Sequence, residues 1–222
     1  MGNPESAPSA PLPRTLFYFA DPMCSWCWGF SPVMEAIVRT FPDLPVSIIV
    51  GGLRAGNDRP MESGLREEIL HHWRDVQRRS GQPFVFDNAL PDGFRYDTEP
   101  PCRAVVSMIA LQRKAALAYF RDLQHAFYAE QQNIVDTDVL AERARVYGVD
   151  DNTFRAHFEL EATRERTRRH FMFARETGVR GFPTVILGDA RGTATLTQGF
   201  RTFDEVRPEI ERWLADDSDA RH

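Results

Sequence analysis

Residues 20–30 read ADPMCSWCWGF and hold two of the three cysteines of the chain, Cys24 and Cys27. They follow an apolar run at 15–19, TLFYF, which has the length and composition of a β-strand. Apolar side chains then recur at helical spacing up to about residue 40. The sequence therefore predicts that the cysteine pair lies where a strand passes into a helix.

This position favours thiol chemistry at Cys24. The first N–H groups of a helix lack carbonyl partners, and the peptide dipoles place partial positive charge there. Both effects favour a thiolate, which is the reactive form of cysteine. Cys27 would lie one helical turn deeper, where it can attack a mixed disulfide formed at Cys24. The spacing predicts dithiol–disulfide exchange.

A zinc half-site is the alternative interpretation of the pair. Structural zinc needs four ligands, usually a second Cys or His pair at similar spacing. Cys102 has no cysteine nearby, and His71 and His72 are adjacent rather than spaced for chelation. We therefore expect no metal and no cofactor.

Further residues carry a resemblance to the thioredoxin superfamily. Pro32 follows Cys24 by eight residues, where that family has a proline in the active-site helix, and residues 178–184 read GVRGFPT, which is similar to the family's cis-proline segment. The long segment between the second strand and Pro183 resembles the DsbA-like branch, which carries an inserted helical domain. The CSWCWGF run is most similar to the FrnE-like, disulfide-isomerase-like members of that branch.

The resemblance implies an α/β fold, thioredoxin-like, with an α-helical domain inserted between the second and third strands. We expect a disordered tail at 1–13, a discontinuous thioredoxin-like domain at 14–55 and 166–216, and the inserted domain at 56–165. The predicted strands are 15–19, 46–50, 184–187 and 193–197, the first two parallel and the last two antiparallel. The predicted helices are 26–40, 62–79, 101–113, 117–130, 139–147, one long helix at 152–177, and a last helix that follows a capping box at 202–205 and reaches about 214.

The resemblance also implies a substrate-binding edge beside the cysteines. Pro183 would form a cis bond that faces Cys24, and the backbone of Phe182 would pair with the substrate chain. Ser25 and Trp26, between the cysteines, would belong to the surface that a substrate covers, and we expect Trp26 to be largely exposed.

Three other residues favour structural roles or fill gaps in the pattern. Trp28 is expected in the core, and Cys102 is expected to be a buried small hydrophobe. Thioredoxin-like enzymes often carry a buried carboxylate six residues before the nucleophile, where this chain has Tyr18. Glu35 is the candidate that we consider as its substitute.

The function predicted is that of a thiol–disulfide oxidoreductase, with disulfide isomerase included. Its partners would be protein or small-molecule thiols and disulfides, glutathione included, and its direction would depend on its reduction potential. One alternative is a glutathione-dependent transferase or isomerase of the kappa-class or 2-hydroxychromene-2-carboxylate isomerase type, although those enzymes typically have serine where Cys24 stands. Another alternative is a redox-inert interaction module.

Composition excludes two classes of partner. The 222-residue chain is 42% hydrophobic and 27% charged with a formal net charge of −5, whereas nucleic-acid binders need clustered positive charge. It contains no apolar run of about 18 residues, so we expect no membrane span. The first thirteen residues lack the basic start and apolar core of a signal peptide, and we therefore expect a cytoplasmic protein.

Overall fold

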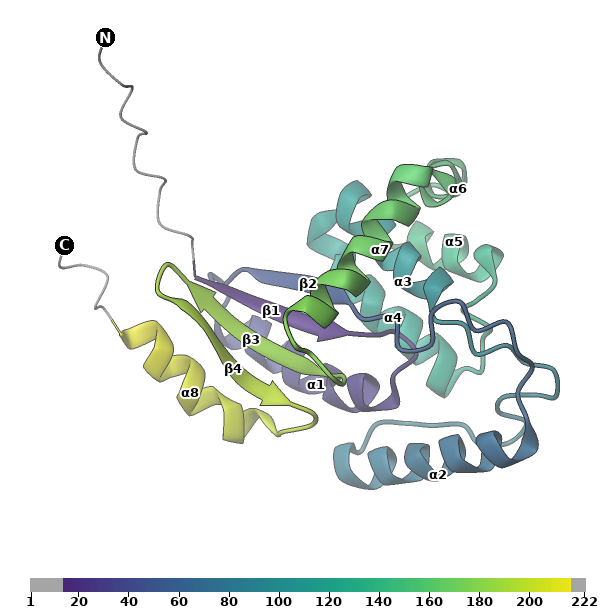
Figure 1. Ribbon diagram of the computed structural model, residues 1–222, viewed down its shortest axis with the longest axis horizontal. Coiled ribbons are helices and arrows are strands. Elements are labelled where there is room, and N and C mark those ends of the chain that lie inside the picture. Colours follow the sequence, from purple (N-terminus) through teal and green to yellow (C-terminus); the bar gives the residue numbers. More distant parts are fainter. Residues whose placement is uncertain (1–13, 217–222) are drawn as a thin grey trace, which may run out of the picture.

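The structure is a computed structural model that describes residues 14–216, so the tail expected at 1–13 lies outside the described residues. Its elements follow one another along the chain as Figure 1 shows. They are β1 (Thr15–Ala20), α1 (Ser25–Thr40), β2 (Val46–Val50), α2 (Ser63–Ser80), α3 (Glu99–Leu111), the short 3₁₀-helix η1 (Arg113–Ala115), α4 (Ala116–Ala129), α5 (Thr137–Val146), α6 (Asp151–Glu159), α7 (Glu161–Glu176), β3 (Thr184–Asp189), β4 (Gly192–Gln198) and α8 (Phe203–Ala215).

The four strands form one mixed sheet in the order β2-β1-β3-β4. β1 pairs parallel to β2, with Leu16 opposite Val46, and antiparallel to β3, with Leu16 opposite Leu187. β3 and β4 form an antiparallel pair. The α/β, thioredoxin-like fold is confirmed, and helices α2 to α6 lie in sequence between its second and third strands.

Alternate residues of β1 serve the two faces of the sheet, because successive strand side chains point in opposite directions. Leu16 and Tyr18 join the main core with residues of α1, α4 and α8. Phe19 packs on the other face in a smaller cluster with Ala174 of α7. Figure 1 shows the sheet between α7 and α1. The main core continues from the sheet into the helical segment, so no break in packing separates the two.

The single helix predicted at 152–177 is wrong, because the chain breaks at Leu160. Leu160 has an extended backbone, with φ −59° and ψ 134°, and it ends α6 and precedes α7. The Thr163 hydroxyl donates a hydrogen bond to the free carbonyl of His157 at 2.7 Å, which satisfies a group that the helix end leaves open. α7 also spans the predicted domain boundary at 165/166, and the boundaries therefore stay a prediction.

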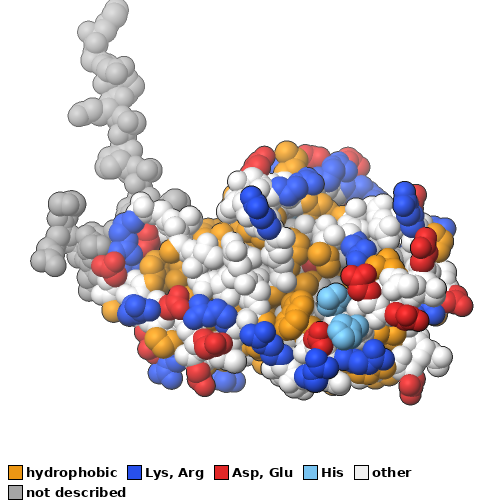
Figure 2. All heavy atoms as spheres, turned by 60° about the horizontal axis from the view of Figure 1, so that its bottom comes forward, with side chains coloured by type: hydrophobic (Ala, Val, Ile, Leu, Met, Phe, Trp, Pro, Cys, Tyr) orange, Lys and Arg blue, Asp and Glu red, His pale blue; other side chains and the backbone are white. Residues whose placement is uncertain are grey.

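The surface carries both signs of charge. On the face in Figure 2, Lys and Arg side chains alternate with Asp and Glu, and hydrophobic side chains appear between them. Mixed charge of this kind creates no extended positive field on that face. Within residues 14–216, none of the helices combines the length and the apolar character that a bilayer crossing requires.

Candidate active site

Cys24 is the N-cap residue of α1. Its φ of −89° and ψ of 115° are extended, and its carbonyl accepts the first helical hydrogen bond, from the Trp28 N–H at 3.1 Å. Its own N–H donates to the Asp21 carbonyl at 3.1 Å, which closes a turn between β1 and the helix. The Cys24 side chain is only 6% exposed, so the open position expected for it is wrong. A substrate sulfur can approach it from one direction only.

Cys27 lies in the first turn of α1 and is fully buried. Burial raises its pKa well above the ordinary thiol value, and the neighbouring Cys24 adds to that rise. At neutral pH Cys27 is therefore a protonated thiol behind Cys24. The two sulfurs differ in access and in acidity, which separates an attacking from a resolving role.

The loop before β3 brings Phe182 and Pro183 to Cys24. The Phe182–Pro183 peptide bond is cis, and the Cys24 thiol donates to the Phe182 carbonyl with a sulfur–oxygen distance of 3.4 Å. Pro183 is buried and Phe182 is half-buried. The ring of Phe182 lies over Gly51, where a Cβ atom would come within 2.0 Å of the ring. Gly51 is thus a site residue that the sequence analysis missed.

Trp26 is half-buried, which corrects the expectation that it is largely exposed. Its ring lies 6.2 Å from the ring of Phe200, which follows β4, and Phe200 in turn contacts Phe30 at 6.4 Å between ring centroids. Nothing in the sequence near the cysteines indicated Phe200, because this contact depends on the distant β4–α8 connection. Ser25, beside Trp26, is also half-buried.

The buried carboxylate of the site is Asp21, which the sequence analysis did not single out. It is fully buried and accepts hydrogen bonds from the N–H groups of Met23 at 2.9 Å and Leu53 at 2.7 Å. Burial raises its pKa, and these two backbone bonds partly offset that rise. The Cys102 thiol donates to its second oxygen at 3.5 Å. Asp21 therefore fixes the turn before Cys24 to the loop after β2.

Glu35 does not occupy this role. Its side chain is 45% exposed and pairs with Arg121 at 2.9 Å. Tyr18 is 1% exposed, and its pKa is raised well above the usual value by burial and, less strongly, by charge on Cys27 and Cys24. A neutral phenol, rather than a carboxylate, thus faces the second cysteine from β1.

Two structural expectations hold. Trp28 is 1% exposed, donates its indole N–H to the Pro83 carbonyl at 3.0 Å and stacks on Tyr128 with ring centroids 6.4 Å apart. Cys102 is fully buried, and burial raises its pKa well above the usual thiol value, with the Asp21 charge second. Among residues 14–216, no three His, Cys, Asp or Glu side chains gather as metal ligands would.

A family model described as the DSBA-like thioredoxin domain matches residues 15–208. A proposed protein disulfide isomerase from Nitrosomonas europaea is 37% identical, with 90% of this chain and 97% of that chain covered and a TM-score of 0.85. The cytosolic disulfide reductase DsbM from Pseudomonas aeruginosa is 29% identical, with 90% and 98% covered and a TM-score of 0.76. A structure of DsbM with GSH is 30% identical, with 90% and 98% covered and a TM-score of 0.75.

Curated relatives are more distant. ClpXP adapter proteins SpxH from Halalkalibacterium halodurans and Bacillus subtilis are each 24% identical, with 78% of this chain and 58% of each relative covered. The chain thus spans less than two thirds of the length of these curated relatives.

Proposed function

Because the chain belongs to the family of DSBA-like thioredoxin domains, we propose that it is a thiol–disulfide oxidoreductase in which Cys24 attacks and Cys27 resolves. One observation carries the proposal. The Cys24 sulfur lies at the start of α1, 3.4 Å from the Phe182 carbonyl, while Cys27 is buried one turn behind it. An accessible sulfur and a protected sulfur in series suit a mixed disulfide that is formed and then resolved.

The first step exchanges one disulfide bond for another. The Cys24 thiolate attacks one sulfur of a substrate disulfide, the substrate S–S bond breaks, and the other substrate sulfur leaves as a thiolate that takes a proton from water. The raised pKa of Cys27 keeps that thiol protonated, so it does not compete for the substrate. The Phe182 backbone lies beside the mixed disulfide, where an extended substrate segment can pair with it.

The second step releases the substrate. Cys27 loses its proton and attacks the Cys24 sulfur, which forms the Cys24–Cys27 disulfide and frees the second substrate thiol. Two electrons pass from the protein dithiol to the substrate, and a thiol reductant such as glutathione restores the dithiol by the reverse exchange. In isomerisation, the freed substrate thiol instead attacks another sulfur of the substrate, and Cys24 is released without net oxidation.

We propose that the protein works as a reductase or isomerase in the cytoplasm with glutathione as electron donor. Two similarities support this direction. The similar DsbM is described as a cytosolic disulfide reductase and has a structure with GSH, and the similar protein from Nitrosomonas europaea is described as a disulfide isomerase. Proteins with substrate disulfides are the partners that the half-buried, aromatic surroundings of Trp26 would contact.

One preparation separates the candidate functions. Insulin reduction with glutathione, refolding of scrambled ribonuclease and conjugation of glutathione to chlorodinitrobenzene are measured on the native protein, Cys24→Ser and Cys102→Ala. We expect the first two activities in the native protein and in Cys102→Ala, which removes a buried thiol outside the pair, and their loss in Cys24→Ser. Conjugation that survives Cys24→Ser, without either exchange activity in the native protein, would indicate the glutathione transferase alternative.

A second candidate, an adapter without redox chemistry, is suggested by the likeness to SpxH. An adapter would keep its binding function in Cys24→Ser. The buried, protonated Cys27 directly behind Cys24 favours exchange over this role, because a binding surface has no need of a resolving thiol.

A further inference from the structure

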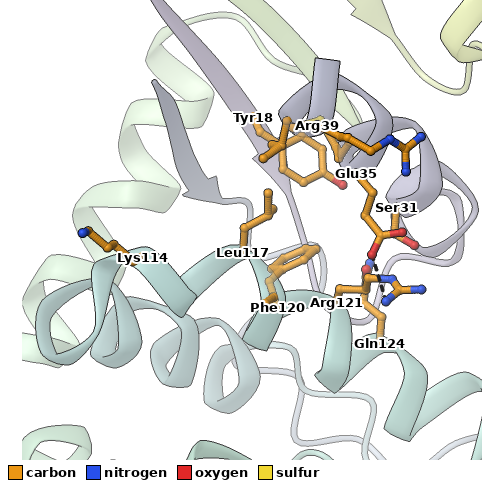
Figure 3. A pocket seen from close by; sticks show the side chains of 12 residues that line it. Tyr18, Ser31, Glu35, Arg39, Lys114, Leu117, Phe120, Arg121 and Gln124 are labelled. Carbon is orange, nitrogen blue, oxygen red and sulfur yellow. Dashed lines mark ion pairs between the residues drawn. The ribbon is translucent and has the colours of Figure 1, made fainter. Parts of the chain in front are cut away.

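A cavity of about 460 Å³ lies between β1, α1 and α4, apart from the cysteine site. Figure 3 shows Tyr18 of β1 and Leu117 and Phe120 of α4 around the same space. Met34 of α1 also lines it, so its inner wall is largely apolar and aromatic. Neither Cys24 nor Phe182 contributes to the lining. Its size falls in the range of small-molecule sites, which is about 300–1,000 Å³.

The inner wall carries buried polar atoms without partners. Gln124 is fully buried, and within residues 14–216 neither its amide nitrogen nor its amide oxygen has a hydrogen-bond partner. The Tyr18 hydroxyl also lacks a partner with hydrogen-bond geometry, although the Cys27 thiol lies near it. An unsatisfied buried polar group costs about 1–3 kcal/mol, so a side chain with two such atoms calls for a specific reason.

The carboxamide of Gln124 offers a donor and an acceptor side by side. A molecule with a lactam edge, an N–H next to a C=O, would satisfy both atoms at once. The Tyr18 hydroxyl can serve as donor or acceptor to a neighbouring atom of the same molecule. Flat rings fit between Tyr18 and Phe120, because aromatic rings favour stacked and edge contacts.

The mouth of the cavity carries net positive charge. Arg39 and Lys114 are exposed, and among the described residues neither has an ion-pair partner. Figure 3 shows them on either side of the cavity, with the Glu35–Arg121 ion pair, 2.9 Å long, across another part of it. Three cations against one carboxylate favour an anionic ligand over a neutral or cationic one.

We propose that this cavity is a binding site for a small aromatic carboxylate with a lactam edge. The ring lies against Tyr18 and Phe120, the lactam pairs with the Gln124 carboxamide, and the carboxylate faces Lys114 or Arg39. The site goes beyond the proposed thiol chemistry, since its ligand neither contacts Cys24 nor requires exchange.

Calorimetric titration of the full chain tests the site. The probe is 6-hydroxynicotinate in its lactam form, and the matched compounds are 2-pyridone, which lacks the carboxylate, and benzoate, which lacks the lactam. We expect saturable one-to-one binding of 6-hydroxynicotinate, with the two matched compounds weaker by about tenfold each, the loss typical of one charge-assisted or paired hydrogen-bond contact. No saturable binding at millimolar 6-hydroxynicotinate, or equal binding of all three compounds, overturns the proposal.

Substitutions locate the probe. Gln124→Leu removes the two unpaired polar atoms with little change in volume, so we expect a melting temperature at or above that of the native protein and about tenfold weaker binding. Lys114→Ser should also weaken binding, whereas Arg113→Ser, which removes a neighbouring charge outside the cavity lining, should leave it unchanged. Unaltered affinity in both Gln124→Leu and Lys114→Ser would refute the site.

One more variant separates this site from the proposed function. Cys24→Ser abolishes exchange chemistry but leaves the cavity lining intact. We expect 6-hydroxynicotinate to bind Cys24→Ser as it binds the native protein. Loss of binding in Cys24→Ser would place the probe at the thiol site and contradict the proposal, whatever the exchange assays give.

Discussion

The sulfur of Cys24 lies 3.4 Å from the backbone carbonyl oxygen of Phe182, a residue 158 positions later in the chain. The contact joins the start of α1 to the loop before β3, at the edge of a sheet that holds β1 and β3 side by side. The ring of Phe182 rests on Gly51 just after β2, so three separate segments fix the geometry at one sulfur.

Gly51 should be intolerant of a side chain. A Cβ atom there would lie 2.0 Å from the Phe182 ring, so Gly51→Ala must displace Phe182 and its carbonyl from Cys24. We expect a loss of about 1–3 kcal/mol in the free energy of unfolding, as for other overpacked sites, together with slower insulin reduction. Gly64→Ala on α2 is the control, because a Cβ there meets no atom within 4 Å. Native rates and stability in Gly51→Ala would mean that the Phe182 position does not matter.

The three thiols should react in a fixed order. Cys24 is the only one of them with measurable exposure, and burial raises the pKa of both Cys27 and Cys102. Iodoacetamide at neutral pH should therefore label Cys24 first and the other two only slowly, as followed by peptide mass spectrometry. Equal labelling in denaturant is the control. Early labelling of Cys102 in the folded protein would show that its burial is overstated.

Asp21 should matter for stability more than its exposed counterparts do. Each of its oxygens accepts one backbone N–H, from Met23 and from Leu53, and the amide of Asp21→Asn can replace only one of these acceptors. We expect Asp21→Asn to lower the free energy of unfolding by about 1–3 kcal/mol in urea titration. Asp43→Asn, at an exposed position, should change it little. Equal effects of the two substitutions would argue against the bridging role of Asp21.

The sequence was sufficient for the fold because its signals were local. Strand-length apolar runs, a βαβ unit and the capping box at the start of α8, in which the Thr202 and Glu205 side chains bond each other's backbone, could all be recognised from neighbouring residues. The break at Leu160 could not, because charged residues at helical spacing continue through it without a proline or glycine.

The site was less predictable because its contacts are long-range. The cysteines and Pro183 follow a recognisable pattern, but the burial of Trp26 depends on Phe200, and the buried acid was sought at Glu35 instead of Asp21. Asp21 stands within the quoted stretch, between the strand and the helix N-cap, where a carboxylate often binds backbone N–H groups. That placement is the signal that could have identified it.

Acid should destabilise the fold through His170. Burial and the nearby Arg166 lower the pKa of His170 from 6.5 to about 4, and its Nδ1 accepts the Val50 N–H at 3.3 Å. Between these two pH values the unfolded chain binds more protons than the folded chain. The stabilisation is therefore complete above pH 6.5 and is lost as the pH falls toward 4, by up to about 3 kcal/mol.

The pH effect can be isolated by substitution. His170→Gln keeps an acceptor for the Val50 N–H and removes the titration, so its free energy of unfolding should fall less between pH 7 and pH 5 than that of the native protein. His72→Gln, which replaces an exposed histidine on α2, should behave like the native protein. If His170→Gln loses as much stability as the native protein over this interval, another group causes the acid sensitivity.

The most direct test of the central claim is to trap the mixed disulfide. Cys27→Ser and Cys24→Ser are incubated separately with oxidised glutathione, and intact mass and peptide mapping locate the adducts. Without its resolving thiol, Cys27→Ser should accumulate a glutathione adduct on Cys24, whereas Cys24→Ser should accumulate little, because Cys27 is fully buried and its pKa is raised. Equal adducts on the two variants, or an adduct mainly on Cys27, would contradict the assignment of Cys24 as nucleophile and Cys27 as resolving thiol.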